Sequence, residues 1–393
     1  MLPRIKISYL NGQLGTVGDS PDGLFALACG AVAVGDTFAL EKAYSVRSLD
    51  DVAALGITAD DNPRLYKHLR EFYDEADTGT ELVVWGVAKS ATMASLCDYA
   101  GGSLRKLIEG QAGRLRGVFV AQDGVAPGDA AEGLAPDVFA ALAPAQKLAE
   151  WSTDELYAPI FVVLEGRGYT DGDGMRDMSR QLYNRVGILV GDTAPGSEGA
   201  CVGTMAGRLA SLPVQRNLGR VKDGPLYPTL MYVGTAKVEE GGSQIAGLYD
   251  KGYITPRRYV GRSGYYFTDD RLACDPTDDY AHIANRRVVD KAYRIVYDTL
   301  LDMMLDELEV NEDGTLQNGV VKSWQQAVEN AINRSMTANG ELSAGDGEGC
   351  ECYIDPTQDV LATSKVLVTV RVRPFGYARY VDVNLGFLVT QTQ

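Results

Sequence analysis

Histidine is nearly absent from this sequence, because His68 and His282 are the only two among 393 residues. A hydrolytic triad needs a base that accepts a proton near neutral pH, and only these two side chains could serve. The sequence has no G-x-S-x-G nucleophile turn. His68 is expected on a solvated helical face, and the charge of nearby Arg286 would lower the pKa of His282. We therefore predict no catalytic residue.

Ligand-binding motifs are also missing. No strand is followed by the glycine spacing of a dinucleotide or phosphate loop. The acidic segment YTDGDGMRD fails as an EF-hand, because the positions that need glycine and glutamate hold Arg176 and Leu182. Of six cysteines only Cys350 and Cys352 are close, and C-x-C is not zinc spacing. We predict reduced structural thiols and neither a cofactor nor a metal site.

Positive charge is scarce, with 37 lysines and arginines against 53 acidic residues and a net charge of −16. That balance opposes a polyanionic partner, so we predict no nucleic-acid binding. No apolar run approaches the roughly 20 residues of a membrane span, and none is expected. The first 23 residues lack the apolar stretch of a secretory signal, which favours a cytoplasmic protein.

The segment 24–195 alternates short runs of valine and isoleucine with amphipathic stretches. The apolar runs are AVAVG, ELVVWGVA, LRGVFVA, APIFVVLEG and VGILVGD. Continuous apolar strands separated by amphipathic helices are typical of a mainly parallel sheet covered on both faces. We predict an α/β layer domain here.

The segment 196–393 is predicted as a C-terminal α+β domain. Long helices are expected over about 279–309 and 320–339. Near the end, four valines alternate with other residues before the turn of Pro374, and a second run follows over 379–389. These valines are Val366, Val368, Val370 and Val372. The pattern predicts a terminal antiparallel hairpin.

Residues 1–23 are expected to form an extended arm, because they lack core-forming periodicity. Within them Arg4 to Leu10 alternates Ile5, Ile7 and Tyr9 with other residues, as a strand does. No partner strand is evident nearby in the sequence.

Two adjacent arginines, Arg286 and Arg287, open the first long helix. Cations in a first helical turn oppose the helix dipole, so a partner must offset them. Asp278 and Asp279 are the expected counter-charges, either of them also as the N-cap, and Arg287 could pair with Asp290. A contact within the subunit and a contact to a neighbouring subunit are both open.

The segment GRSGYYFTDDRLACDPTDDYAHIANRRVVDKAYRIV resembles a motif of contractile tail sheath proteins, found in phages and related injection systems. In that family an aromatic strand and a loop lead into an Arg-Arg pair that opens a long helix. The terminal hairpin with its proline is also similar, as is the order of arm and α/β unit. The element W-G-x-R-T of the family is replaced by GYYFTDD, which indicates a divergent, prophage-type branch.

The resemblance implies a subtilisin-like layer fold without its catalytic triad, and a structural subunit instead of an enzyme. Such subunits stack as hexameric rings around a tail tube and contract to drive it through a cell envelope. The arm and the C-terminal strand of one subunit extend the sheets of neighbours. The residues implied in subunit linking are Arg4, Ile5, Ile7, Tyr9, Val366, Val368, Val370, Val372, Tyr380, Val381 and Val383.

The partners so implied are further copies, the tube protein, and baseplate and terminator proteins, without membrane insertion. The expected location is the virion tail, after assembly in the bacterial cytoplasm. Two alternatives stay open: an α/β hydrolase or transferase of unrecognised type, and another tail or baseplate assembly protein.

Overall fold

The computed structural model describes residues 21–385 except 125, 131, 171–173 and 346. By internal contacts the chain divides into two compact units, Met1–Asp306 and Glu307–Gln393. Within the described residues, none of the helices combines the length and apolar character that a membrane span requires.

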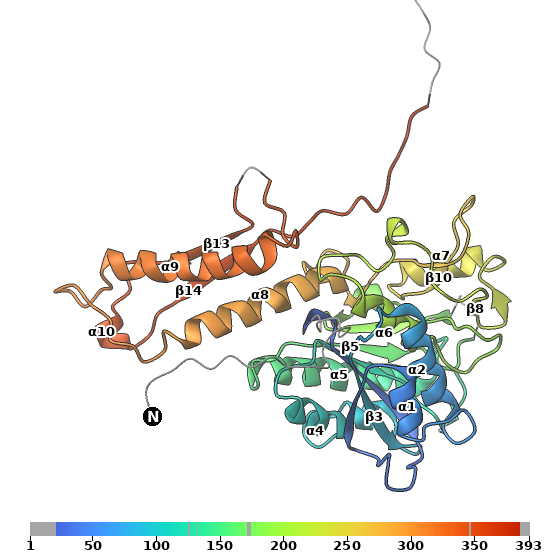
Figure 1. Cartoon of the computed structure of the whole chain (residues 1–393). Coiled ribbons are helices and arrows are strands. Elements are labelled where there is room, and N and C mark those ends of the chain that lie inside the picture. The colour runs from blue at the N-terminus through green and yellow to red at the C-terminus, as the bar shows by residue number, and fades with distance from the viewer. Residues whose placement is uncertain (1–20, 125, 131, 171–173, 346, 386–393) are drawn as a thin grey trace, which may run out of the picture. The chain divides into compact units, whose positions relative to one another are not determined.

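A six-stranded sheet forms the centre of the first unit, in the order β2-β3-β1-β4-β5-β7 (Figure 1). Its strands are β1 (Phe25–Ala31), β2 (Ala43–Val46), β3 (Leu82–Ala88), β4 (Gly117–Val120), β5 (Phe161–Glu165) and β7 (Val186–Leu189). Every pairing is parallel except that of β2 with β3. Strands β1, β4, β5 and β7 are buried along their whole length. The prediction of a mainly parallel α/β sheet is therefore confirmed.

The crossover helices cover both faces of this sheet. They are α1 (Leu49–Ala54), α2 (Pro63–Glu75), α3 (Met93–Leu96), α4 (Ser103–Gly110), α5 (Pro136–Asp154) and α6 (Val202–Ala210). Helix α2 packs against α6, and both contact β1. Helix α5 packs against α3 and contacts β5 and β7. Right-handed crossovers place α2 on one face and α3 to α5 on the other. Helix α6, which follows the last strand β7, lies beside α2.

Two glycines let α2 and α6 approach closely. A Cβ atom on Gly203 would lie 2.2 Å from the carbonyl oxygen of His68. A Cβ atom on Gly207 would lie 2.4 Å from that of Phe72. Only glycine fits at such a distance, so this glycine-rich segment forms part of the core of the first unit.

Short elements complete the first unit around helix α8 (Ile283–Leu301). They are η1 (Pro21–Gly23), η3 (Met178–Arg180), β6 (Leu182–Tyr183), η4 (Val221–Asp223), β8 (Tyr232–Val233), β9 (Ala236–Lys237), α7 (Gly242–Asp250), β10 (Pro256–Arg257), β11 (Tyr266–Phe267) and β12 (Ala273–Cys274). The pairs β8–β9, β10–β11 and β6–β12 are antiparallel.

The predicted boundary between residues 195 and 196 does not coincide with the division of the structure, which falls after Asp306. The sequence pattern changes at residue 196 because parallel strands give way to glycine-rich helix and loop. Helix α6 nevertheless packs on β1, β4 and β5, so the change of pattern is not a change of core.

The second unit contains α9 (Asn318–Ile332), the π-helical turn η5 (Asn333–Thr337), β13 (Cys350–Ile354), α10 (Val360–Thr363) and β14 (Val368–Val372). Strand β13 alternates buried and exposed residues and packs on α9. The thiol of Cys350 is 3.7 Å from the carbonyl oxygen of Glu329 on that helix. Both predicted long helices are present, as α8 and α9, with shorter bounds.

The predicted terminal hairpin is not confirmed. Strand β14 pairs antiparallel with β13, from Cys350 opposite Val372 to Ile354 opposite Val368. Residues 379–385, the described part of the predicted second strand, form no strand. An alternating pattern predicts a strand but does not identify its partner strand. Strand β13, which packs against α9, is the strand that pairs with β14.

Replacing Leu305 by glycine should stabilise the protein by about 0.5–1 kcal/mol, because this leucine is held in the left-handed region. Its φ is +66° and its side chain is 96% exposed, directly before the division between the units. Urea denaturation would measure the change. Met304→Gly, one residue earlier in the same exposed turn, should destabilise instead, and a loss with Leu305→Gly would contradict the argument.

Candidate functional site

The predicted arginine pair lies in the first turn of α8, and both side chains are buried. The guanidinium of Arg286 donates to Asp290 from Nη2 at 3.0 Å and from Nε at 3.1 Å. Its Cζ lies 4.2 Å from the ring centre of Tyr280. Burial lowers the pKa of Arg286, and the adjacent Asp290 opposes that effect. The partner is thus one helical turn further along the same helix.

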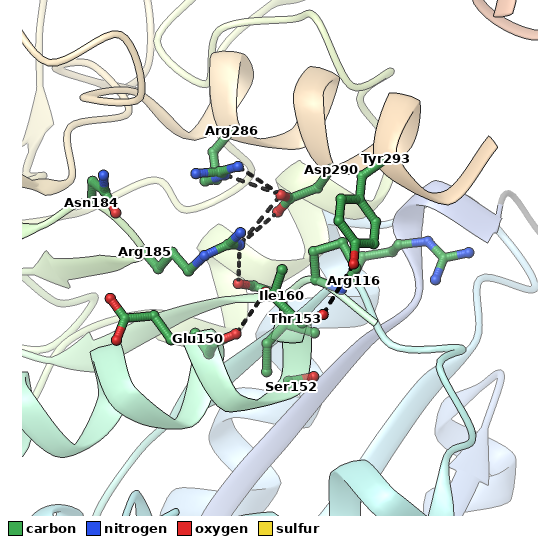
Figure 2. A network of polar contacts seen from close by, with 12 residues as sticks. Arg116, Glu150, Ser152, Thr153, Ile160, Asn184, Arg185, Arg286, Asp290 and Tyr293 are labelled. Atoms are coloured by element: carbon green, nitrogen blue, oxygen red, sulfur yellow. Dashed lines mark hydrogen bonds and ion pairs between the residues drawn. The ribbon is translucent and has the colours of Figure 1, made fainter. Parts of the chain in front are cut away.

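Asp290 is shared by two elements, as Figure 2 shows. Arg185, directly before β7, donates from Nη1 to the carboxylate oxygens of Asp290 at 3.1 and 3.3 Å. The same nitrogen is 3.0 Å from the carbonyl oxygen of Ile160, next to β5. One buried carboxylate therefore connects α8 to the amino ends of two parallel strands.

Three further cations of α8 extend this connection. Arg287 Nη2 donates to the carbonyl oxygen of Leu212 at 2.9 Å, and Lys291 pairs with Asp22 at 2.6 Å. Arg294 donates to the carbonyl oxygens of Leu115 and Pro159. Burial lowers the pKa of Arg294 to about 9, with a further contribution from a neighbouring arginine. The basic face of α8 is fixed against backbone oxygens at the amino end of the sheet.

The predicted counter-charges lie elsewhere. Asp278 accepts hydrogen bonds from the backbone nitrogen of Tyr280 at 2.7 Å and from Asn184 at 3.2 Å. The backbone oxygen of Asp279 accepts from Asn285 at 3.1 Å. The expected pairing of Arg287 with Asp290 is replaced by that of Arg286, while Arg287 donates to a backbone oxygen of another segment. Sequence spacing pointed to Asp290 but not to Arg185.

The helix begins instead against Asp270. Its Oδ2 accepts from the backbone nitrogen of Ala284 at 2.8 Å, and its carbonyl oxygen from that of Ile283 at 2.9 Å. His282 Nδ1 lies 3.0 Å from Asp270 Oδ1. Burial raises the pKa of Asp270. Adjacent aspartates in a turn are usually solvated, but both Asp269 and Asp270 are buried.

Asp269, Asp270 and His282 are also the described residues whose donor atoms could surround a metal ion, all within 4.8 Å of one another. Asn217 Nδ2 already donates to Asp269 at 2.5 Å and to Asp270 at 2.7 Å. The backbone nitrogen of Gly219 donates to Asn217 Oδ1 at 2.8 Å, which fixes the orientation of that amide. The cluster is thus satisfied by hydrogen bonds at the start of α8.

A second charged network lies at the opposite, carboxyl end of the strands. Glu165, the last residue of β5, is fully buried and paired with Arg64. It also accepts from the backbone nitrogens of Gln122 at 3.0 Å and Ala200 at 3.1 Å. His68 lies between Glu165, at 3.6 Å, and Glu71, at 3.5 Å. His68 is 0% exposed, so the expectation of a solvated histidine was wrong.

The protonation of this network follows from its pairing. Burial would raise the pKa of Glu165, but Arg64 and His68 hold it down at about 2. The pKa of Glu71 is also about 2, because His68 and Lys67 outweigh burial. Burial would lower the pKa of His68, yet the two adjacent carboxylates of Glu165 and Glu71 raise it. Both carboxylates are therefore ionised, and the positive form of His68 is favoured.

The position of this network is one where ligands bind in other open α/β sheets. If β1, β3, β4, β5 and β7 are numbered 1 to 5, the parallel strands lie in the order 2-1-3-4-5. In that order the crevice lies beyond the carboxyl ends of the first and third strands. Here Gln122, two residues after β4, donates its backbone N–H to Glu165 in this region. The arrangement holds α2 and α6 on the sheet.

The predicted linking residues of the C-terminal strand divide into two groups. Val368, Val370 and Val372 lie on β14, opposite alternate residues of β13, and are partly buried. Val366 precedes the strand and packs on the small core around Leu316. The β13–β14 sheet has two strands, so within the described residues one edge of β14 is unpaired.

Beyond β14 the chain carries exposed apolar side chains. The exposed fractions are 77% for Tyr380, 73% for Val381, 76% for Val383 and 96% for Leu385. Val381, Val383 and Leu385 alternate with the polar residues Asp382 and Asn384. The other predicted linking residues, Arg4, Ile5, Ile7 and Tyr9, lie outside the described residues.

Comparison with known families gives two matches along the chain. A model described as DUF2586, N-terminal domain, matches residues 2–271. A model described as DUF2586, C-terminal domain, matches residues 279–392. A comparison with curated proteins gives no match.

Solved structures from contractile particles are similar over nearly the whole chain. A chain of the anti-feeding prophage baseplate is 16% identical, with a TM-score of 0.64 and 99% of both chains covered. A chain of the sheath complex of the extracellular contractile injection system PVC, in the contracted state, is 14% identical. Its TM-score is 0.63, with 98% of this chain and 97% of that chain covered. At these identities the likeness shows a shared fold.

Proposed function

The chain belongs to the DUF2586 family, and from that premise we propose that it is a sheath subunit of a contractile, phage-tail-like particle. Copies would stack as hexameric rings around a tube and shorten on triggering to drive the tube through an envelope. The likeness to sheath and baseplate chains over 98–99% of this chain supports the proposal. A prophage-type origin, assembly in a bacterial cytoplasm and a subtilisin-like layer are part of the same proposal.

The observation that carries the proposal is the exposed apolar segment after β14. Tyr380, Val381, Val383 and Leu385 would each lose contact with water if the segment joined the sheet of another copy. Alternation of apolar and polar residues suits a strand with one covered face. The partners proposed are therefore neighbouring copies, together with tube, baseplate and terminator proteins. The proposed role is mechanical and not enzymatic.

A second candidate is a baseplate component, because one of the similar chains comes from the baseplate of the anti-feeding prophage. Electron microscopy of the purified protein separates the two. A sheath subunit should form long tubes or stacked rings, whereas a baseplate component should form only closed assemblies of limited size. Discrete monomers under all assembly conditions would overturn the proposal.

The triple variant Val381→Asp, Val383→Asp and Leu385→Asp should form no tubes but should keep the wild-type fold. The three side chains are exposed, so the free energy of unfolding should move by no more than about 0.5 kcal/mol. Burying three carboxylates in a neighbouring sheet would cost far more. Electron microscopy and urea denaturation measure the two effects.

Asp382→Ser with Asn384→Ser is the matched control, because it alters the opposite face of the same segment and should leave tubes intact. Tubes formed by the triple aspartate variant at the wild-type concentration would contradict the role of this segment.

A further inference from the structure

A basic hairpin tip stands out on this acidic protein. The end of β10 and the loop that leads to β11 carry Arg257, Arg258 and Arg262 and no acidic residue from 257 to 264. We call residues 257–263 the arginine tip. At its end Val260 is 107% exposed, next to Gly261 with a φ of +77°. The tip thus presents one apolar side chain flanked by positive charge, and arginine is enriched at protein interfaces.

The arginine tip is held in place by ring contacts. The Cζ of Arg257 lies 4.1 Å from the ring centre of Tyr259. That ring packs edge-on against Tyr266 of β11, with ring centres 5.4 Å apart. Arg258 pairs with Glu239 at 3.1 Å but keeps about half of its side chain exposed. A loop of fixed shape loses little entropy when it binds.

A complementary surface runs along the last turns of α8 and the turn after it. We call it the acidic stripe, and it consists of Tyr297, Asp298, Leu301, Asp302, Met304 and Asp306. All six are exposed. Between Tyr297 and Asp306 there are three aspartates and no lysine, arginine or histidine. Tyr297 and Leu301 are four residues apart, as are Asp298 and Asp302, so an apolar row lies beside an acidic row.

The tip and the stripe lie at opposite ends of the first unit. In Figure 1 the β10 hairpin lies at the right, and the carboxyl end of α8 lies towards the left. The two surfaces therefore cannot meet within one copy. A contact between different surfaces of two copies repeats head to tail and produces rings or helical assemblies.

We infer that the arginine tip of one copy docks on the acidic stripe of a second copy, with Val260 against the apolar row and the arginines against the aspartates. The inference rests on the proposed function, since it names a contact through which the proposed assembly would form. Copies that each carry a net charge of −16 repel one another at most orientations. The arginine tip favours the orientation in which its positive charges face the acidic stripe of the second copy, because the two surfaces attract each other there.

Charge reversal tests the inference on the full chain. Arg258→Glu with Arg262→Glu should raise the protein concentration needed for half of the material to sediment by about tenfold or more. Asp298→Arg with Asp302→Arg should do the same. The variant with all four changes restores opposite charges across the contact and should assemble within about threefold of the wild-type concentration. Raising the salt concentration should weaken wild-type assembly.

Arg70→Glu with Arg180→Glu is the matched control, because these exposed arginines lie elsewhere and their reversal changes the net charge equally. It should assemble as the wild type does. Assembly of Arg258→Glu with Arg262→Glu at the wild-type concentration would overturn the inference but leave the proposed function standing. Loss in both reversed pairs without recovery in the fourfold variant would also overturn it, since each surface would then contact something else. A wild-type protein that stays monomeric would overturn both.

Discussion

Replacing Asp290 by alanine should lower the free energy of unfolding by about 3–5 kcal/mol, because two buried arginines lose the carboxylate to which both donate. Arg185 and Arg286 both donate to this carboxylate, and both are largely buried. Water cannot replace the carboxylate at such a site without opening the structure. Urea denaturation, followed by tryptophan fluorescence and circular dichroism, would measure the loss.

Asp298→Ala is the matched control, since Asp298 lies two turns further along α8 and is exposed. Its effect should stay within about 0.5 kcal/mol in the monomer. A loss of less than 1 kcal/mol for Asp290→Ala would contradict the view that this carboxylate holds α8 to the sheet.

Replacing Glu165 by glutamine should cost about 3 kcal/mol at pH 7, because the partly buried Arg64 then loses its ion-pair partner. The cost should depend on pH. The pKa of Glu165 is about 2 in the folded protein against a usual 4.5, so the carboxylate contributes stability above about pH 4.5. That contribution is lost as the pH falls towards 2. The stability difference between wild type and variant should therefore shrink across this range.

Urea denaturation at a series of pH values between 7 and 2.5 would test this behaviour. Glu155→Gln alters an exposed carboxylate at the end of α5 and should give a small difference at every pH. A Glu165→Gln deficit that stays constant down to pH 2.5 would show that the network does not depend on the charge of Glu165.

The buried charge networks around Asp290 and Glu165 show why the sequence identified only part of the candidate site. Arg286 was recognised because two adjacent arginines in a first helical turn are electrostatically costly without a partner. Its partner Asp290 is one turn away in the same helix and was within reach of spacing rules. Arg185 is 105 residues from Asp290 in sequence, and no local pattern connects them. The same holds for Glu165 and Arg64, which are 101 residues apart.

Burial of polar groups was the main source of error. His68 lies among charged residues in the sequence, which is typical of a solvated helical face. It is buried because α6 packs on it through Gly203, whose lack of a side chain lets the helices approach. Asp269 and Asp270 are likewise buried, and the partner that satisfies both is Asn217, which lies 52 and 53 residues earlier in the sequence. Residue type predicts exposure only on average, and paired charges are the exception.

Local sequence was sufficient for the parallel sheet and the long helices. Continuous apolar runs can be buried on both faces only when helices cover the sheet, so pattern and architecture imply each other. The partner of β14, the division after Asp306 and both charged networks depended on tertiary structure. The two networks join segments 105 and 101 residues apart along the chain, and their stability comes from burial and pairing, which exist only after the chain has folded.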